Sequence, residues 1–310
     1  MLELYFFNVG HGDSIAIKFP NDEWGVIDCT LCDGQSEPNV LRFLKRNNVK
    51  HLKFVCVTHP HIDHFLGMER IVEDYRNNID NFILFHDGQN SVYEKQDSSL
   101  SRALITFFQF QNHKIIWASR CEKYKVGDLE INLLNPNSQI TEELFGSYFT
   151  GRQKYILNKL SVVMYFEYQG RHVLLNADVP RKACRNFLKT TPVKADILKI
   201  SHHGSIHNNS ESLLTAIGRE GCISIISSDG NQKYPSVPHE NVLNWLEQRL
   251  RSNILRTFDL NEVQAPDPDL ESIDAIDSIS EIVDNPVTDG YFKVVIDNNG
   301  QITPQAFTRI

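Results

Sequence analysis

The chain has 310 residues, of which 41% are hydrophobic and 23% are charged, so it is long enough to bury a substantial core in one domain or in two closely packed ones. Its formal net charge of −8 argues against the broad basic surface that a protein needs to hold duplex nucleic acid unaided. No apolar run approaches the length that spans a bilayer, and the first residues alternate like a strand without a basic leader, so we expect a cytoplasmic protein that does not enter a membrane.

Short alternating or apolar segments recur along the chain with helical stretches between them, which predicts an α+β protein. Because both alternating and fully apolar strands occur, we expect two sheets covered by outer helices. The predicted strands lie near residues 2–8, 14–19, 24–28, 53–57, 81–85, 114–118, 129–134, 161–167, 172–176, 196–200 and 222–227. The predicted helices lie near residues 38–47, 65–76, 99–111, 181–189, 210–217 and 239–250.

One segment near the end of the chain has a distinct composition. Residues 258–292 contain ten acidic residues and no lysine or arginine. Two interpretations stay open: a flexible solvated loop, or a docking or autoinhibitory segment that mimics a polyanion. We expect one domain over residues 1–310, with an acidic insertion at about 258–289. The polar stretch 87–101 is predicted to be a loop near the cleft.

Six cysteines lie mostly in apolar segments, where a free thiol behaves as a small hydrophobic residue, and this usage suggests a reducing compartment. Cys29 and Cys32 have the spacing of a redox or zinc-binding pair. No second pair follows at the spacing of a zinc ribbon, so we expect core or loop thiols.

The most informative motif combines three histidines and an aspartate directly after the apolar stretch 54–57. Alternate residues of an extended segment point the same way, so His59 and His61 can face one cation, while Asp63 and His64 follow where the chain turns and can face a second. The competing interpretation is a solvated turn in which Asp63 caps the next helix. Capping accounts for one acidic residue and for none of the histidines.

Two later strands end in further candidate ligands. A buried strand runs out into Asp178, whose two carboxylate oxygens can bridge two cations. Another short apolar strand leads to His202 and His203, in a loop that Gly204 allows to turn sharply. Taken alone, Asp178 is equally well explained as a helix cap, and the histidine pair as a solvated turn.

These motifs together resemble the metallo-β-lactamase-fold hydrolases, and among them the hydrolase domain of ComEC-type competence proteins. The resemblance covers about residues 1–250 and a closing hairpin near 290–308. It implies an αββα sandwich of two mixed sheets covered by outer helices, and two divalent cations, zinc or manganese, with Asp178 as the bridging ligand. The segments that carry it are residues 7–14, 26–29, 59–64, 158–163, 178, 199–205, 227–231 and 238–239.

The chain departs from the family pattern at two places. Many members have a further histidine before the bridging aspartate, where this chain reads Asn158-Lys159-Leu160-Ser161. Asn158 can substitute with an amide oxygen or a bound water, which suits manganese better than zinc. In the final loop the family's His-Pro pair is reordered as Pro238-His239, which leaves open whether His239 reaches a substrate.

The resemblance also implies a mechanism. Paired cations lower the pKa of a bound water from about 15.7 to about 7. Asp63 and Asp178 would orient this nucleophile, and His203 or His239 would contact the substrate or leaving group. We expect His202 to be the metal ligand of the His-His pair because it comes first after the strand. For Lys199, binding of a substrate phosphate and extension into solvent both remain open.

The leading functional hypothesis is a metal-dependent phosphodiesterase or nuclease acting on DNA or RNA. The resemblance extends to effector subunits of bacterial antiviral systems. A protein partner that gates activity is a separate hypothesis for this chain. Two alternatives stay open: a hydrolase of a small ester, lactone or lactam on the same metals, and a subunit that acts mainly by binding a partner. The basic residues at 45–53 and 181–189 add local positive charge, although such runs are more often solvated helix faces.

Overall fold

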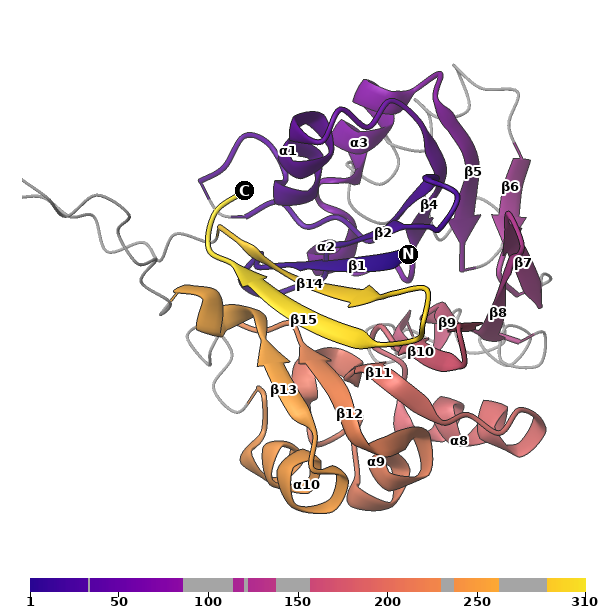
Figure 1. Cartoon of the computed structure of the whole chain (residues 1–310), viewed down its shortest axis with the longest axis vertical. Coiled ribbons are helices and arrows are strands. Elements are labelled where there is room, and N and C mark those ends of the chain that lie inside the picture. Colours follow the sequence, from indigo (N-terminus) through magenta and orange to yellow (C-terminus); the bar gives the residue numbers. More distant parts are fainter. Residues whose placement is uncertain (33, 86–113, 120–121, 138–156, 230–236, 262–288) are drawn as a thin grey trace, which may run out of the picture.

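Two β-sheets form the body of the computed structural model (Figure 1). A single hydrophobic core contains residues from both sheets, with Phe6 and Phe54 from the first and Phe166 and Leu198 from the second all fully buried. Burying a side chain of this size stabilises the fold by about 1.5–3 kcal/mol. The structure describes residues 1–32, 34–85, 114–119, 122–137, 157–229, 237–261 and 289–310.

The first sheet consists of β1 (Leu2–Phe7), β2 (Ile15–Lys18), β3 (Trp24–Ile27), β4 (Leu52–Val57), β5 (Ile79–Leu84), β6 (Lys114–Trp117), β14 (Tyr291–Ile296) and β15 (Ile302–Phe307). Their order is β15-β14-β1-β2-β3-β4-β5-β6. β14 pairs antiparallel with β1 and with β15, so the closing hairpin predicted from the sequence lies beside the N-terminal strand. β3 to β6 run parallel, which brings their carboxyl ends to one edge of the sheet.

The second sheet consists of β7 (Lys123–Val126), β8 (Leu129–Asn135), β9 (Val163–Tyr168), β10 (Arg171–Leu175), β11 (Ala195–Lys199), β12 (Gly218–Ile226) and β13 (Asn253–Arg256). Their order is β13-β12-β11-β10-β9-β8-β7. β10 to β13 run parallel, whereas β7, β8 and β9 are antiparallel to their neighbours. Both sheets are therefore mixed.

Helices cover the outer faces of the two sheets (Figure 1). α1 (Asn39–Arg46), α2 (Ile62–Phe65) and α3 (Met68–Tyr75) accompany the first sheet, and α8 (Arg181–Thr190), α9 (Glu211–Ile217) and α10 (Glu240–Leu250) pack on the second. Short 3₁₀ turns lie at Asn158–Leu160, Ser201–Gly204 and Thr257–Asn261. The predicted αββα sandwich is confirmed. No helix in the described part of the chain is both long and apolar enough to cross a bilayer.

The sequence-based element boundaries need three corrections. The helix predicted over 65–76 corresponds to α3, and the separate short helix α2 precedes it. Between them, Gly67 packs so closely on the segment after β3 that a Cβ there would lie 2.8 Å from the Cys29 sulfur. The strands β7 and β13 were not predicted. Each contains only two apolar residues, whereas the four-residue strands β2, β3 and β6, which were predicted, contain three.

Two predicted segments cannot be compared with the fold. The helix predicted over 99–111 and the polar loop over 87–101 lie outside the described residues, as does most of the acidic insertion. The five cysteines in the described part of the chain are buried thiols: Cys29, Cys32, Cys56, Cys184 and Cys222.

Candidate metal centre

The six predicted metal ligands follow the carboxyl ends of three strands. His59 and His61 come directly after β4 and lead into α2, which carries Asp63 and His64. Asp178 follows β10, and His202 and His203 form the turn after β11. Because β10 and β11 are parallel neighbours and the end of β4 faces them from the other sheet, the structure brings all these side chains together.

The carboxylate of Asp178 is at the middle of the group. It is 1% exposed. Its Oδ2 atom lies 3.7 Å from His59 Nε2 and 3.6 Å from His202 Nε2. Its Oδ1 atom lies 3.6 Å from His64 Nε2 and 3.9 Å from His203 Nε2. The two oxygens of one carboxylate therefore face two different pairs of imidazoles.

On the Oδ2 side of Asp178, imidazoles from the segments that follow β4 and β11 come together. His59 Nε2 lies 3.1 Å from His61 Nδ1. Asn158 lies beside His202, with 3.4 Å between Asn158 Nδ2 and His202 Nδ1, and its Oδ1 atom is buried without a hydrogen-bond partner. The position where the family has a further histidine is thus next to His202, which supplies an imidazole on this side.

On the Oδ1 side, Asp63 adds a second carboxylate. Its Oδ2 atom lies 3.3 Å from His203 Nε2 and 3.7 Å from His64 Nε2. His203 is completely buried, whereas the His202 side chain is 35% exposed. The expectation that His202 alone of the pair reaches the metal centre therefore needs correction. Both imidazoles reach it, and His203 lies deeper.

Hydrogen bonds behind the imidazoles from β4 and α2 set their tautomers. His64 Nδ1 donates to Asp28 Oδ2 at 2.7 Å, and the Thr58 hydroxyl donates to the same oxygen at 2.7 Å. Because the Thr58 hydroxyl proton is used in this way, its oxygen accepts from His59 Nδ1 at 3.1 Å. In both rings Nδ1 is taken up by this hydrogen bond, which leaves Nε2 as the nitrogen that faces Asp178. Carboxylate–histidine pairs of this kind orient metal ligands.

The two imidazoles after β11 are oriented in the same way. His202 Nδ1 donates to Asn208 Oδ1 at 3.0 Å, and His203 Nδ1 donates to the carbonyl oxygen of Ser227 at 2.9 Å. Their Nε2 atoms also face inward.

The residues present fit divalent cations. Three inward-facing atoms of the described residues are buried without a hydrogen-bond partner: His64 Nε2, His203 Nε2 and Asp178 Oδ1. A buried polar atom left unsatisfied costs about 1–3 kcal/mol. Imidazole nitrogens and carboxylate oxygens are ligands of zinc and manganese, and a cation between them would satisfy all three atoms.

The histidines of the centre are of two kinds, those whose pKa is lowered and those whose pKa is raised. Burial and the neighbouring His64 lower the pKa of His59 well below its usual value, and burial likewise lowers the pKa of His61, so both are neutral and able to ligate. Burial also opposes charge on His64, but the carboxylates of Asp178, Asp28 and Asp63 outweigh it and raise its pKa. The pocket around His64 therefore favours positive charge.

Comparison with known proteins agrees with this geometry. Residues 8–82, which include the motif from His59 to His64, match the family model of the metallo-beta-lactamase superfamily. This part of the chain is similar to that superfamily. The matched model and the candidate ligand groups indicate a metal-dependent hydrolase.

One curated relative is ComE operon protein 3 of Bacillus subtilis (strain 168), which is 23% identical over 278 residues, or 84% of this chain and 32% of that protein. The chain thus spans about a third of the relative's length. Solved structures similar to it include YhfI from Bacillus subtilis, with a TM-score of 0.45, 12% identity and coverage of 83% of this chain and 96% of that one. The short form of human tRNase Z has a TM-score of 0.43 and 11% identity, with coverage of 82% and 91%.

Strained backbone is concentrated around the metal centre. His202 and His203 both have left-handed φ values, of 48° and 53°, and Asp28 and Ala177 share this conformation. Gly204 follows with φ 86°, and a Cβ there would lie 2.7 Å from Pro238. Left-handed non-glycine residues are uncommon and gather at functional sites, where the surrounding structure holds them. Here they turn both imidazoles inward.

Lys199 occupies neither of the places expected from the sequence. Its side chain is fully buried, and Nζ lies 3.0 Å from Asp13 Oδ1 and 3.2 Å from the carbonyl oxygen of Ile200. It neither extends into solvent nor is accessible to a substrate phosphate. Asp13 Oδ2 in turn lies 3.9 Å from His64 Nδ1, so this ion pair lies directly behind the centre.

His239 lies beside the centre, and its imidazole accepts a hydrogen bond from the backbone. Its backbone N–H donates to the carbonyl oxygen of Gly204 at 3.1 Å, and its Nδ1 accepts from the N–H of Asn241 at 3.1 Å, which caps α10. The structure thus gives this histidine a capping role. Contact with a substrate remains a prediction.

Three residues of the centre were not among the predicted site residues: His11, Asp13 and Asp28. His11 Nε2 lies 3.5 Å from Asp63 Oδ2. All three lie in segments 7–14 and 26–29, which carry part of the family resemblance. Only this resemblance could have identified them from the sequence, because none of the three lies in a histidine-rich motif.

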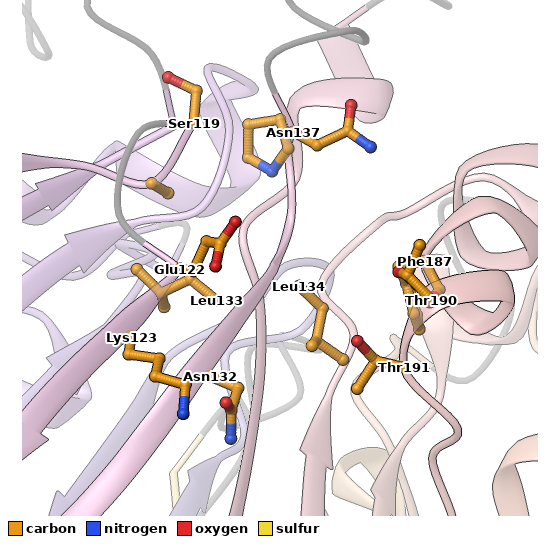
Figure 2. A pocket seen from close by; sticks show the side chains of 12 residues that line it. Ser119, Glu122, Lys123, Asn132, Leu133, Leu134, Asn137, Phe187, Thr190 and Thr191 are labelled. Atoms are coloured by element: carbon orange, nitrogen blue, oxygen red, sulfur yellow. The ribbon is translucent and has the colours of Figure 1, made fainter.

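A separate pocket of about 460 Å³ lies between the β7–β8 hairpin and the end of α8 (Figure 2). Side chains on its walls include Lys123, Asn132, Phe187 and Thr190. It shares no lining residue with the metal centre.

Proposed function

We propose that the chain is a phosphodiesterase that cleaves DNA or RNA with two divalent cations, manganese or zinc. The observation that carries this proposal is the position of Asp178, whose two buried oxygens face two separate pairs of imidazoles. A carboxylate placed in this way fits a pair of cations better than a single one. Paired cations of this kind are used by phosphatases and nucleases.

The geometry supports a specific division of the ligands. The first cation would be held by His59, His61, His202 and Asp178 Oδ2, with Asn158 next to it. The second would be held by residues on the other side of the same carboxylate: Asp63, His64, His203 and Asp178 Oδ1. When bound, such cations make hydroxide available near neutral pH and balance the charge that develops on a phosphoryl oxygen.

The remaining roles belong to the chain's own residues. Asp63 is 23% exposed and Asp178 is 1% exposed, so Asp63 is the carboxylate closer to an entering substrate. Asp28 and Thr58 hold the imidazoles behind it in one tautomer. Asp63 would orient the attacking water, and the buried residues behind it would exclude other water.

Positive charge close to the centre supports a polyanionic substrate despite the net charge of −8. α8 starts three residues after Asp178, and its first residue, Arg181, donates from Nε to the carbonyl oxygen of His207 at 2.8 Å. This bond places the guanidinium beside the loop that carries His202. Lys182 and Arg185 are exposed on the same helix. A single strand can follow such a local basic surface, with bound cations adding to it.

The proposal has a direct test. The metal content of the purified protein would be measured by elemental analysis. Hydrolysis of single-stranded DNA, RNA, bis-p-nitrophenyl phosphate, a carboxyl ester, a lactone and a β-lactam would then be compared with manganese or zinc added. We expect two equivalents of metal and cleavage of the phosphodiesters. Asp178→Asn should abolish cleavage, whereas Asp22→Asn, at an exposed turn, should not.

Absence of metal would contradict the proposal, as would turnover of the ester, lactone or lactam alone. Full activity of Asp178→Asn would contradict the assigned centre.

The wider setting is also proposed. The chain would act in the cytoplasm as one hydrolase domain over residues 1–310, with the acidic insertion at about 258–289, as an effector subunit of a bacterial antiviral system gated by a protein partner. This part rests on the sequence resemblance, together with the buried thiols that suit a reducing compartment. Cleavage that increases on addition of a copurifying partner would support gating, and cleavage that such a partner leaves unchanged would contradict it.

A further inference from the structure

We propose that His11 is an additional ligand of the second cation. This inference rests on the proposed function, because it concerns the same centre. His11 lies in the turn between β1 and β2, in the sequence Gly10-His11-Gly12-Asp13, and it reaches the centre from the first hairpin of the chain.

The donor atoms around Asp63 have the spacing of ligands that share a cation. Asp63 Oδ2 lies 3.5 Å from His11 Nε2 and 3.3 Å from His203 Nε2. The ring centres of His11 and His203 are 4.3 Å apart. Ligand atoms at about 2.1 Å from one cation are about 3.0–3.4 Å from each other. The measured separations are at or just beyond this range, so a small inward movement would complete the set.

The turn that carries His11 is built against Asp63. The N–H of Asp13 donates to the carbonyl oxygen of Asp63 at 3.1 Å, and the Thr30 hydroxyl lies between the carbonyl oxygens of Asp13 and Asp63. Gly12 has φ 130°, and a Cβ there would collide with the same Asp63 carbonyl. The backbone therefore approaches as closely as glycine allows, which holds the neighbouring imidazole of His11 beside the Asp63 carboxylate.

The exposure of His11 distinguishes it from the other imidazoles of the second cation. Its side chain is 16% exposed, whereas His64 and His203 are fully buried. His11 would thus be the ligand on the open side of the centre. The competing role for a histidine in this place is contact with the substrate. The two roles differ in one measurable property, because a ligand contributes to cation affinity when no substrate is present.

The test is a cation titration of the full chain. Metal-free protein would be titrated with Mn²⁺ by calorimetry, and the Co²⁺-substituted protein would be examined by visible absorption. We expect wild-type protein to bind two equivalents. His11→Gln should keep the first and weaken the second by roughly tenfold or more, since loss even of a hydrogen-bond partner behind a ligand costs 10–100-fold. The Co²⁺ absorption bands should also change.

His51→Gln is the matched control, because His51 pairs with Asp80 on the surface. It should bind both equivalents as wild type does. Circular dichroism of metal-free His11→Gln would verify that the variant folds.

Three results would overturn the inference. If His11→Gln binds both equivalents with wild-type affinity and an unchanged Co²⁺ spectrum, His11 is not a ligand, while the proposed function stands. If in addition its KM for a phosphodiester rises, the imidazole contacts the substrate. If wild-type protein binds no cation at all, the proposed function fails together with the inference.

Discussion

The buried ion pair between Lys199 and Asp13 leads to a quantitative prediction. Lys199→Met keeps the length of the side chain and removes its charge. Asp13 is 1% exposed and its carboxylate lies 3.0 Å from the lysine nitrogen, so the substitution leaves an uncompensated charge in the core. Removing one partner of a buried pair costs about 3–5 kcal/mol. Whole domains are stable by only about 5–15 kcal/mol, so the loss would be large.

The double variant separates loss of the ion pair from loss of packing. In Asp13→Asn combined with Lys199→Met no unpaired charge remains, and replacing a whole buried pair is often nearly neutral. We therefore expect the double variant to be more stable than Lys199→Met alone. Lys123→Met is the matched control, because Lys123 is 58% exposed and pairs with Glu130 on the surface, where an ion pair contributes at most about 1 kcal/mol.

Urea unfolding of the metal-free proteins measures these differences in free energy of unfolding. A loss below about 1 kcal/mol in Lys199→Met, comparable with that of a surface pair, would refute the reasoning. Strictly additive effects of the two substitutions would refute it as well, because additivity would mean that the two side chains do not interact.

Three further predictions concern the centre and its substrate. Addition of Mn²⁺ at about 100 times its dissociation constant should stabilise the chain by about 2.7 kcal/mol and raise the melting temperature in a thermal scan, whereas an unchanged temperature would mean that no cation binds the folded state. Asp28→Asn removes the carboxylate that accepts from His64 Nδ1, and calorimetry should show Mn²⁺ binding weakened about 10–100-fold. Wild-type affinity in this variant would mean that Asp28 does not support a metal ligand. Arg181→Ala should raise KM for single-stranded DNA by up to about fivefold and leave cleavage of bis-p-nitrophenyl phosphate unchanged; equal effects on both substrates would argue against a contact with the polynucleotide.

Most of the fold was predictable because its strands are strongly patterned. The apolar segments before His59, Asp178 and His202 are buried strands that end where the sequence indicates. β7 and β13 were not predicted because each contains only two apolar residues. The break between α2 and α3 was not predicted because the close approach of the backbone at Gly67 depends on tertiary packing. Local pattern thus predicts elements well and boundaries less well.

The candidate site was predictable in its members and less so in its geometry. The sequence shows that His202 and His203 follow the end of a strand, and this predicts that they lie at an edge of the sheet. Both imidazoles turn inward because both residues have left-handed φ values, which the sequence does not show. Lys199 gave no such signal. Its burial depends on Asp13, from a turn near the other end of the sequence, and pairing between distant segments leaves no local pattern.

Charge balance explains why cations would belong to this fold. Asp13 is neutralised by Lys199, and Asp28 by its bonds to His64 and Thr58. The carboxylates of Asp63 and Asp178 face imidazoles, and their pKa values lie below the usual range because the attraction of the surrounding histidines outweighs burial, so both are charged. Among the residues that the structure describes, His59 and His61 next to them are held neutral by burial and by the nearby His64. The same carboxylates raise the pKa values of His64 and His203, so protons on these two imidazoles offset the negative charge when no metal is bound. Divalent cations would take the place of these protons and would also satisfy the buried Nε2 and Oδ1 atoms.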